Sequence, residues 1–186
     1  MVKTHCLAVF VSSASVLACT ACAGTAVSPS STPQRNVTMT FNDLTADAAP
    51  VTIYSESGFS VSANPGSWVV RTTYGHPAPF IQFVAPAGNA VTGQISVTAD
   101  RHAAFSFQSV DLYSSTTQIP YTISGVKDDA IVFTVSDRLP NTFGNFRTVV
   151  NPHGSDVIDT LTIRLSNPAA PCCSNPMGVD NVVLSQ

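Results

Sequence analysis

The chain has 186 residues, of which only 10% are charged, and its formal net charge is −3. Lys occurs twice and Glu once, whereas Ser and Thr together supply 42 residues, so helical bundles, coiled coils and most α/β enzymes are excluded. A hydrophobic share of 44% excludes a wholly disordered chain, and the lack of a basic cluster argues against nucleic acid as a partner. The remaining class is a secreted all-β domain, which we expect to be monomeric.

The first 23 residues have the pattern of an export signal. Lys3 and His5 precede a short apolar run, and Ala21-Cys22-Ala23 fits the small-residue cleavage pattern. The stretch is also similar to a lipoprotein signal in which Cys22 becomes the lipidated N-terminus, and both alternatives stay open. Either predicts a secreted, periplasmic or outer-membrane protein, with a lipid anchor as its one link to a membrane. The Ser- and Pro-rich residues 24–35 follow as an extended tether.

From residue 36 to 186 the chain is a series of short alternating segments. Val37, Met39 and Phe41 alternate with polar residues, which is the period of a half-buried strand. Gly, Pro or Asn separates nearly all of the segments. This spacing predicts a two-sheet antiparallel β-sandwich of roughly ten to twelve strands. Its inner faces should carry eight large apolar residues: Phe41, Phe59, Phe83, Phe105, Phe107, Phe133, Leu161 and Ile163.

The expected folded segment contains two cysteines, the adjacent residues Cys172 and Cys173. Successive Cα atoms lie about 3.8 Å apart, less than the ~4.4–6.8 Å that a disulfide usually spans, so a vicinal disulfide here would be strained. Two free thiols or an intermolecular bond are the alternatives. A zinc site is not expected, because adjacent thiols lack the spacing of a zinc motif.

Motifs of known catalytic sites are missing from the sequence. It contains no G-x-S-x-G elbow, H-E-x-x-H motif, P-loop or G-x-G-x-x-G. Glycoside hydrolysis needs two acids across one cleft, but Glu56 is the single Glu, and Asp128-Asp129 is expected in a hairpin turn. We therefore expect a protein that is not an enzyme, with a hydrolase or lyase as the less favoured alternative.

Two groups of side chains are candidates for ligand binding. Sugar-binding β-sandwiches offer an exposed aromatic ring that stacks on a pyranose, while amides and carboxylates bind the hydroxyl groups. The competing interpretation of the largest aromatic residues is burial in the core. The first group contains Trp68, Arg71, Tyr74 and His76, and the second contains Asp111 and Tyr113.

Short motifs follow one another in an informative order. They are T-F-N-D-L (40–44), F-S-F-Q-S-V-D-L-Y-S (105–114), L-T-I-R-L (161–165) and G-V-D-N-V-V-L (178–184). This order resembles secreted bacterial jelly-roll domains, namely carbohydrate-binding modules and galactose-binding-like domains, and the ectodomains of exosortase-sorted surface proteins. The resemblance implies a jelly roll that binds a glycan or another cell-surface ligand without catalysis. The alternative is a structural or protein-interaction domain of the bacterial envelope with no small ligand.

Strand parity predicts a calcium ion. Because Phe41 is expected to face inward, period-2 alternation puts Asp43 on the same face, and Asp180 likewise shares the side of Val182. If the first and last strands pair antiparallel, as they do in the resembled modules, the two carboxylates meet and repel unless a cation such as Ca²⁺ neutralises them. The resembled modules often hold a structural calcium between their terminal strands. The alternative is that Asp43 and Asp180 cap turns.

Overall fold

The computed structural model describes residues 34–64, 67–73, 78–85, 90–115, 117–143, 145–167 and 175–186. These residues form thirteen strands and one 3-10 turn, η1 (Asp100–His102), arranged as two antiparallel sheets, which confirms the all-β sandwich. Within these ranges, no helix has the length and apolar character needed to cross a membrane. The export signal with Cys22, the side chains of Tyr74 and His76, and the Cys172-Cys173 pair lie outside the described residues.

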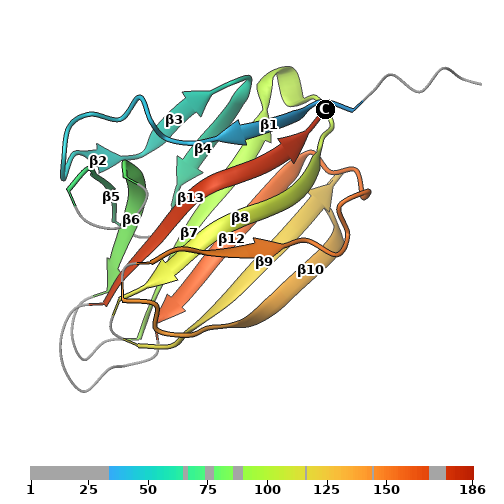
Figure 1. Ribbon diagram of the computed structural model, residues 1–186. Coiled ribbons are helices and arrows are strands. Elements are labelled where there is room, and N and C mark those ends of the chain that lie inside the picture. The colour runs from blue at the N-terminus through green and yellow to red at the C-terminus, as the bar shows by residue number, and fades with distance from the viewer. Residues whose placement is uncertain are drawn as a thin grey trace, which may run out of the picture. The chain divides into compact units, whose positions relative to one another are not determined.

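One layer is a seven-stranded sheet. Its strand order is β11 (Arg147–Val150), β8 (Ser106–Ser114), β13 (Asn175–Ser185), β6 (Phe80–Ala85), β5 (Trp68–Arg71) and β2 (Pro50–Val51), and β1 (Asn36–Met39) also pairs with β13. The last strand of the sequence, drawn in red in Figure 1, therefore lies inside this sheet between β8 and β6.

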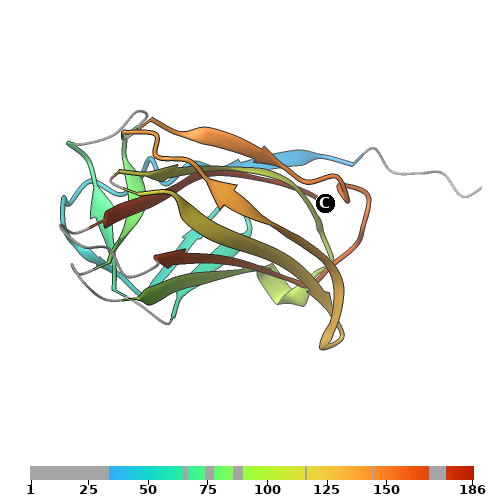
Figure 2. The same ribbon diagram turned by 90° about the horizontal axis from the view of Figure 1, so that it is seen from below.

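The second layer is a six-stranded sheet. Its order is β10 (Ala130–Leu139), β9 (Ile119–Lys127), β12 (Thr160–Asn167), β7 (Val91–Ala99), β4 (Phe59–Ala63) and β3 (Ile53–Glu56). The two layers are seen edge-on in Figure 2. The strand total exceeds the predicted ten to twelve because short strands such as the two-residue β2 carry no detectable alternation.

Alternation fills the space between the layers with apolar side chains. All eight predicted core residues are buried there, and none is more than 4% exposed. Two glycines allow this packing: a Cβ on Gly93 would lie 2.5 Å from the Phe83 ring, and one on Gly125 would lie 2.2 Å from the Phe133 ring. The core thus depends on close backbone-to-ring contacts as well as on the apolar pattern.

The first and last strands pair antiparallel, as the calcium argument assumed, with Met39 opposite Val182. Backbone hydrogen bonds extend this ladder outward, because the Arg35 N–H donates to the Gln186 carbonyl (2.8 Å) and the Gln186 N–H donates to the Arg35 carbonyl (3.1 Å). Arg35, which the sequence placed in the tether, is therefore already part of the paired region.

Candidate ligand-binding face

The outward-facing side chains of the seven-stranded sheet form a row across four strands. On β8 the residues on either side of Leu112 point away from the core, and β5 and β6 alternate in the same way. The strand register places Val69 opposite Gln82, Gln82 opposite Gly178 and Gly178 opposite Tyr113. We call this set of four the Gln82 row.

Gly178 lets the Tyr113 ring lie across β13. A Cβ at position 178 would lie 2.1 Å from Cε1 of Tyr113, so only glycine leaves room for the ring. The Tyr113 hydroxyl then donates a 3.0 Å hydrogen bond to Oε1 of Gln82, on the far side of the strand. A glycine in the central strand therefore joins β8 to β6 through side chains.

Arg71 and Asp47 continue the row toward the β5 edge. The Arg71 Nε donates to Oε1 of Gln82 (3.3 Å), and its Nη1 lies 3.3 Å from Oδ2 of Asp47 in an ion pair whose side chains are about one-third exposed. The other Asp47 oxygen accepts the Thr72 backbone N–H (2.9 Å). Predicted residues Arg71 and Tyr113 thus meet at one acceptor, the Gln82 oxygen.

Burial contradicts the predicted stacking role of two aromatic residues. Trp68 is 2% exposed and lies in the core, where its ring centroid is 5.7 Å from that of Phe83, because β5 alternation turns it inward. Tyr113 is fully buried on the outer side, packed at 5.3 Å from Phe80 and 5.0 Å from Phe146. Neither ring has a face free for a sugar, so the prediction of exposed rings at these positions is wrong.

An exposed aromatic residue, Phe143, lies near this cluster instead. The segment after β10 is tied to the end of β8, because the Thr142 N–H donates to the Ser114 carbonyl (2.9 Å), and Phe146 packs on Tyr113. Between these two attachments Phe143 is 77% exposed and has a φ of 52°, a conformation that bulky residues rarely adopt. The protein therefore holds a large apolar ring in water at the rim of the outer face.

Asp111 anchors a second polar group on the same face. Its Oδ1 accepts the Thr148 hydroxyl (2.6 Å), and its Oδ2 accepts the Asn181 side-chain amide (2.9 Å). Asp180 lies directly opposite Asp111 in the β8–β13 register and is 1% exposed. Burial raises the pKa of the Asp180 carboxyl to about 7; the Asn181 backbone N–H opposes this shift, and the charges of Asp111 and Glu56 add to it.

The parity argument for a calcium site fails at both aspartates. Strand β1 ends at Met39 and Phe41 has a φ of 58°, so alternation does not continue to Asp43, whose side chain is exposed. In β13, Asn181 has a φ of 45° and the register shifts after Asp180, which puts Asp180 on the opposite face from Val182. The predicted inward pair is therefore wrong, although the ion itself stays a prediction.

Glu56 occupies the place near β1 that Asp43 was expected to take. Its Oε2 accepts the backbone N–H groups of Thr40 (2.8 Å) and Phe41 (2.9 Å), and Oε1 accepts the Thr40 hydroxyl (2.9 Å). No group of three or more His, Cys, Asp or Glu side chains suited to a metal ion occurs in the part of the chain that the structure describes.

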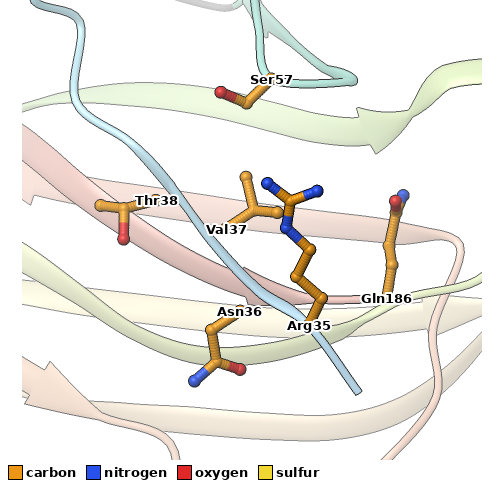
Figure 3. Close-up of a pocket in the computed structure, with 6 residues that line it drawn as sticks. All are labelled: Arg35, Asn36, Val37, Thr38, Ser57 and Gln186. Carbon is orange, nitrogen blue, oxygen red and sulfur yellow. The ribbon is translucent and has the colours of Figure 1, made fainter. Parts of the chain in front are cut away.

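An open pocket of about 480 Å³ lies elsewhere, at the start of β1. In Figure 3 the side chains of Arg35 and Val37 rise on the side of β1 where Ser57 of the β3–β4 turn lies. None of the predicted ligand residues lines it. The lining residues are Arg35, Asn36, Val37, Thr38, Ser57 and Gln186.

Several solved structures are similar to this chain. A DUF4465 family protein from Bacteroides caccae is similar over 81% of this chain and 98% of its own, with 8% identity and a TM-score of 0.53. A family 29 carbohydrate-binding module from Piromyces equi is similar over 83% of this chain and 91% of its own, with 11% identity and a TM-score of 0.47. A cyclase from Fischerella sp. is similar over 81% of this chain and 96% of its own, with 15% identity and a TM-score of 0.47. No protein-family model matches the sequence. No curated protein matches it either.

The likeness to the DUF4465 protein, with a TM-score above 0.5, agrees with the β-sandwich fold. The carbohydrate-binding modules that the sequence resembles are among the structures found. At these identities the likeness concerns the arrangement of strands alone, and a fold of this kind does not determine a function. The side chains of the outer face are the features of this chain that bear on its function.

Sequence reasoning missed two residues of this face. Gln82 sits in the alternating segment 80–83, where its outward position could be read but its partners could not. Phe143 lies in N-T-F-G-N, a turn-like stretch outside any periodic segment. An isolated aromatic residue in a turn was the one signal that could have marked it as a candidate.

Proposed function

We propose that this chain is a noncatalytic glycan-binding domain whose ligand lies on the outer face of the seven-stranded sheet. The observation that supports it best is Phe143, a 77% exposed ring in a left-handed backbone conformation beside the Tyr113 cluster. A pyranose has one apolar face, and an exposed aromatic ring is the group that stacks on it. Conformations of this kind cost free energy and persist most often at binding sites.

Polar groups of the same face would bind the sugar hydroxyl groups. Arg71, Asp111 and Asn181 are half-buried, so each is held in place yet reachable from solvent, and Thr148 is exposed. Together they supply guanidinium, carboxylate, amide and hydroxyl groups, the set that gives glycan sites their orientation and specificity. Asp111 replaces Trp68 as the predicted residue with the strongest support.

The test is a glycan array followed by affinity electrophoresis of the full chain. Phe143→Ala and Asp111→Asn should each weaken binding to any glycan that the wild-type protein binds. Ile131→Ala is the matched control, because Ile131 is 70% exposed on the other sheet and should leave binding unchanged. A wild-type protein that binds no glycan would favour the alternative, an interaction domain of the envelope without a small ligand.

We also propose that a calcium ion binds beside Asp180. This carboxylate fits an oxygen ligand of Ca²⁺, because it is buried, accepts a hydrogen bond from the Asn181 backbone N–H (2.8 Å) and lies within the fields of Asp111 and Glu56. The ion would supply the missing counter-charge. Calcium should raise the thermal midpoint of the wild type and of Asp43→Ala, but not that of Asp180→Ala; equal midpoints with calcium and with chelator would remove the ion.

Export is proposed on the N-terminal sequence pattern. Mass spectrometry of the protein from its native host should show an N-terminus at residue 24 after cleavage by signal peptidase, or a lipid-modified Cys22. An unprocessed Met1 would contradict both alternatives.

A further inference from the structure

Gln82 carries a buried hydrogen-bond donor without an acceptor. Its side chain is 1% exposed, and Nε2 has no hydrogen-bond partner among the residues that the structure describes. The amide cannot simply turn over, because Oε1 accepts from Arg71, whose guanidinium donates only. An unpaired buried donor of this kind destabilises the folded state.

The side of the sheet on which this donor lies is informative. The second unpaired buried atom of the described residues, Nε1 of Trp68, belongs to the core side, where apolar side chains surround it. Gln82 lies instead on the outer side, in the same row as Tyr113 and next to Arg71. Gln82 therefore lies on the side of the sheet that carries the proposed ligand site, whereas Trp68 lies in the core.

The charges around Gln82 select the class of acceptor. Asp47 pairs with the guanidinium that donates to Gln82, and Asp111 adds negative charge to the same face. A carboxylate or sulfate ligand would meet the Asp111 carboxylate there, and the Arg71 guanidinium is already paired with Asp47. An uncharged hydroxyl or ring oxygen has no such penalty.

We infer that Nε2 of Gln82 donates a hydrogen bond to an oxygen of an uncharged glycan bound on this face, and so determines specificity. The inference rests on the proposed glycan-binding function. A sugar that places an oxygen at Nε2 satisfies the donor, while a sugar without that oxygen leaves it buried and unpaired, which is how a polar site discriminates strongly between close analogues. An apolar residue at position 82 would lose this selectivity, together with the acceptor for the Tyr113 hydroxyl and the Arg71 Nε.

The test compares two variants with a matched control. Gln82→Met removes both polar atoms at nearly constant shape, and Gln82→Glu keeps the acceptor for Arg71 and Tyr113 but removes the donor. Gln94→Met is the control, because Gln94 is the half-buried glutamine of the other sheet's outer face. Binding of the full chain is measured by affinity electrophoresis in galactan, mannan, glucomannan and polygalacturonate, and folding by the thermal midpoint.

Wild type and Gln94→Met should bind a neutral polysaccharide equally. Both Gln82 variants should bind it about tenfold more weakly or worse, and the thermal midpoint shows whether each variant still folds. Wild-type affinity in a variant that lacks the donor would overturn the inference while leaving the proposed function intact. Stronger binding to polygalacturonate would overturn the assignment of an uncharged ligand, and a wild type that binds none of the polysaccharides would overturn both proposals.

Discussion

The outer faces of the two sheets differ although the same alternation builds both. On the six-stranded sheet one row runs through five strands, and all its members are hydroxyl residues: Ser62, Ser96, Thr162, Ser124 and Thr134. Neighbouring hydroxyls hydrogen-bond one another, as Ser124 and Thr134 do at 3.2 Å and Ser55 and Ser60 do at 2.8 Å. The seven-stranded sheet instead buries a tyrosine, a glutamine and an aspartate on its outer side.

This difference distinguishes outward-facing side chains that folding requires from those that it does not require. Short hydroxyl side chains satisfy one another or water, so the six-stranded face is a sufficient solvent face for a sandwich. Burying Gln82 and Asp180 costs desolvation free energy that the fold does not need to spend. Costs of this kind concentrate at functional sites, which is why we place ligand binding on the seven-stranded sheet.

Truncating the outer aromatic cluster tests whether that face is packed like a core. Tyr113→Ala should lower the free energy of unfolding by about 3–5 kcal/mol, because a fully buried ring and its contacts with Phe80 and Phe146 are lost. Urea unfolding measures the change. Thr162→Ala, in the hydroxyl row, is the control for an ordinary solvent face, and a loss as large there would erase the contrast.

The pH dependence of stability tests the buried carboxyl. Because the folded-state pKa of Asp180 is raised to about 7, its contribution to stability is fully present below about pH 4, falls as pH rises toward 7, and is constant above. A shift of about three pKa units sets an upper limit of roughly 4 kcal/mol for this loss. Unfolding is followed from pH 4 to 8 with chelator present. Asp180→Asn should lose this component of the profile; an unchanged slope would assign it to another group.

Adding a methyl group at Gly178 of β13 tests whether the Tyr113 ring needs the space over that strand. Gly178→Ala should cost about 1–3 kcal/mol, because the new Cβ would collide with the ring. In a double-mutant cycle with Tyr113→Ala the two losses should fall well short of additive, since removing the ring removes the collision. Additive losses would mean that Gly178 matters for its backbone alone.

The smallest effect is expected on the hydroxyl row. Ser124→Ala removes one exposed hydroxyl pair with Thr134 and should change the free energy of unfolding by less than about 0.5 kcal/mol. Glycan binding should not change at all. Loss of binding in this variant would move the ligand site to the six-stranded sheet and reverse the comparison.

Period-2 patterns were sufficient to predict the sandwich and its core. Each predicted core residue lies in the core, and the Asp128-Asp129 hairpin forms with φ values of 50° and 62° at these two residues. Those features depend on local alternation and turn chemistry, which the sequence displays directly.

The candidate site could be predicted only in part, because it depends on register. That Arg71 and Tyr113 share Gln82 follows from three strand pairings and from the missing side chain at Gly178. The calcium argument failed for a related reason: left-handed residues at Phe41 and Asn181 interrupt alternation at single positions, and no periodic signal marks them. Trp68 was misassigned because Val69 and Val70 beside it hide the parity of β5.

The position of β13 has a consequence for the order of synthesis. Strand β13 pairs with β8, β6 and β1. The seven-stranded sheet therefore cannot be completed until residues 175–185 have left the ribosome. Until then β6 and β8 expose unpaired edges, which recruit other chains when they persist. In a nascent chain the seven-stranded sheet therefore stays incomplete until synthesis ends. An incomplete sheet is compatible with the export that we propose, and it makes any fragment ending before residue 175 prone to aggregate.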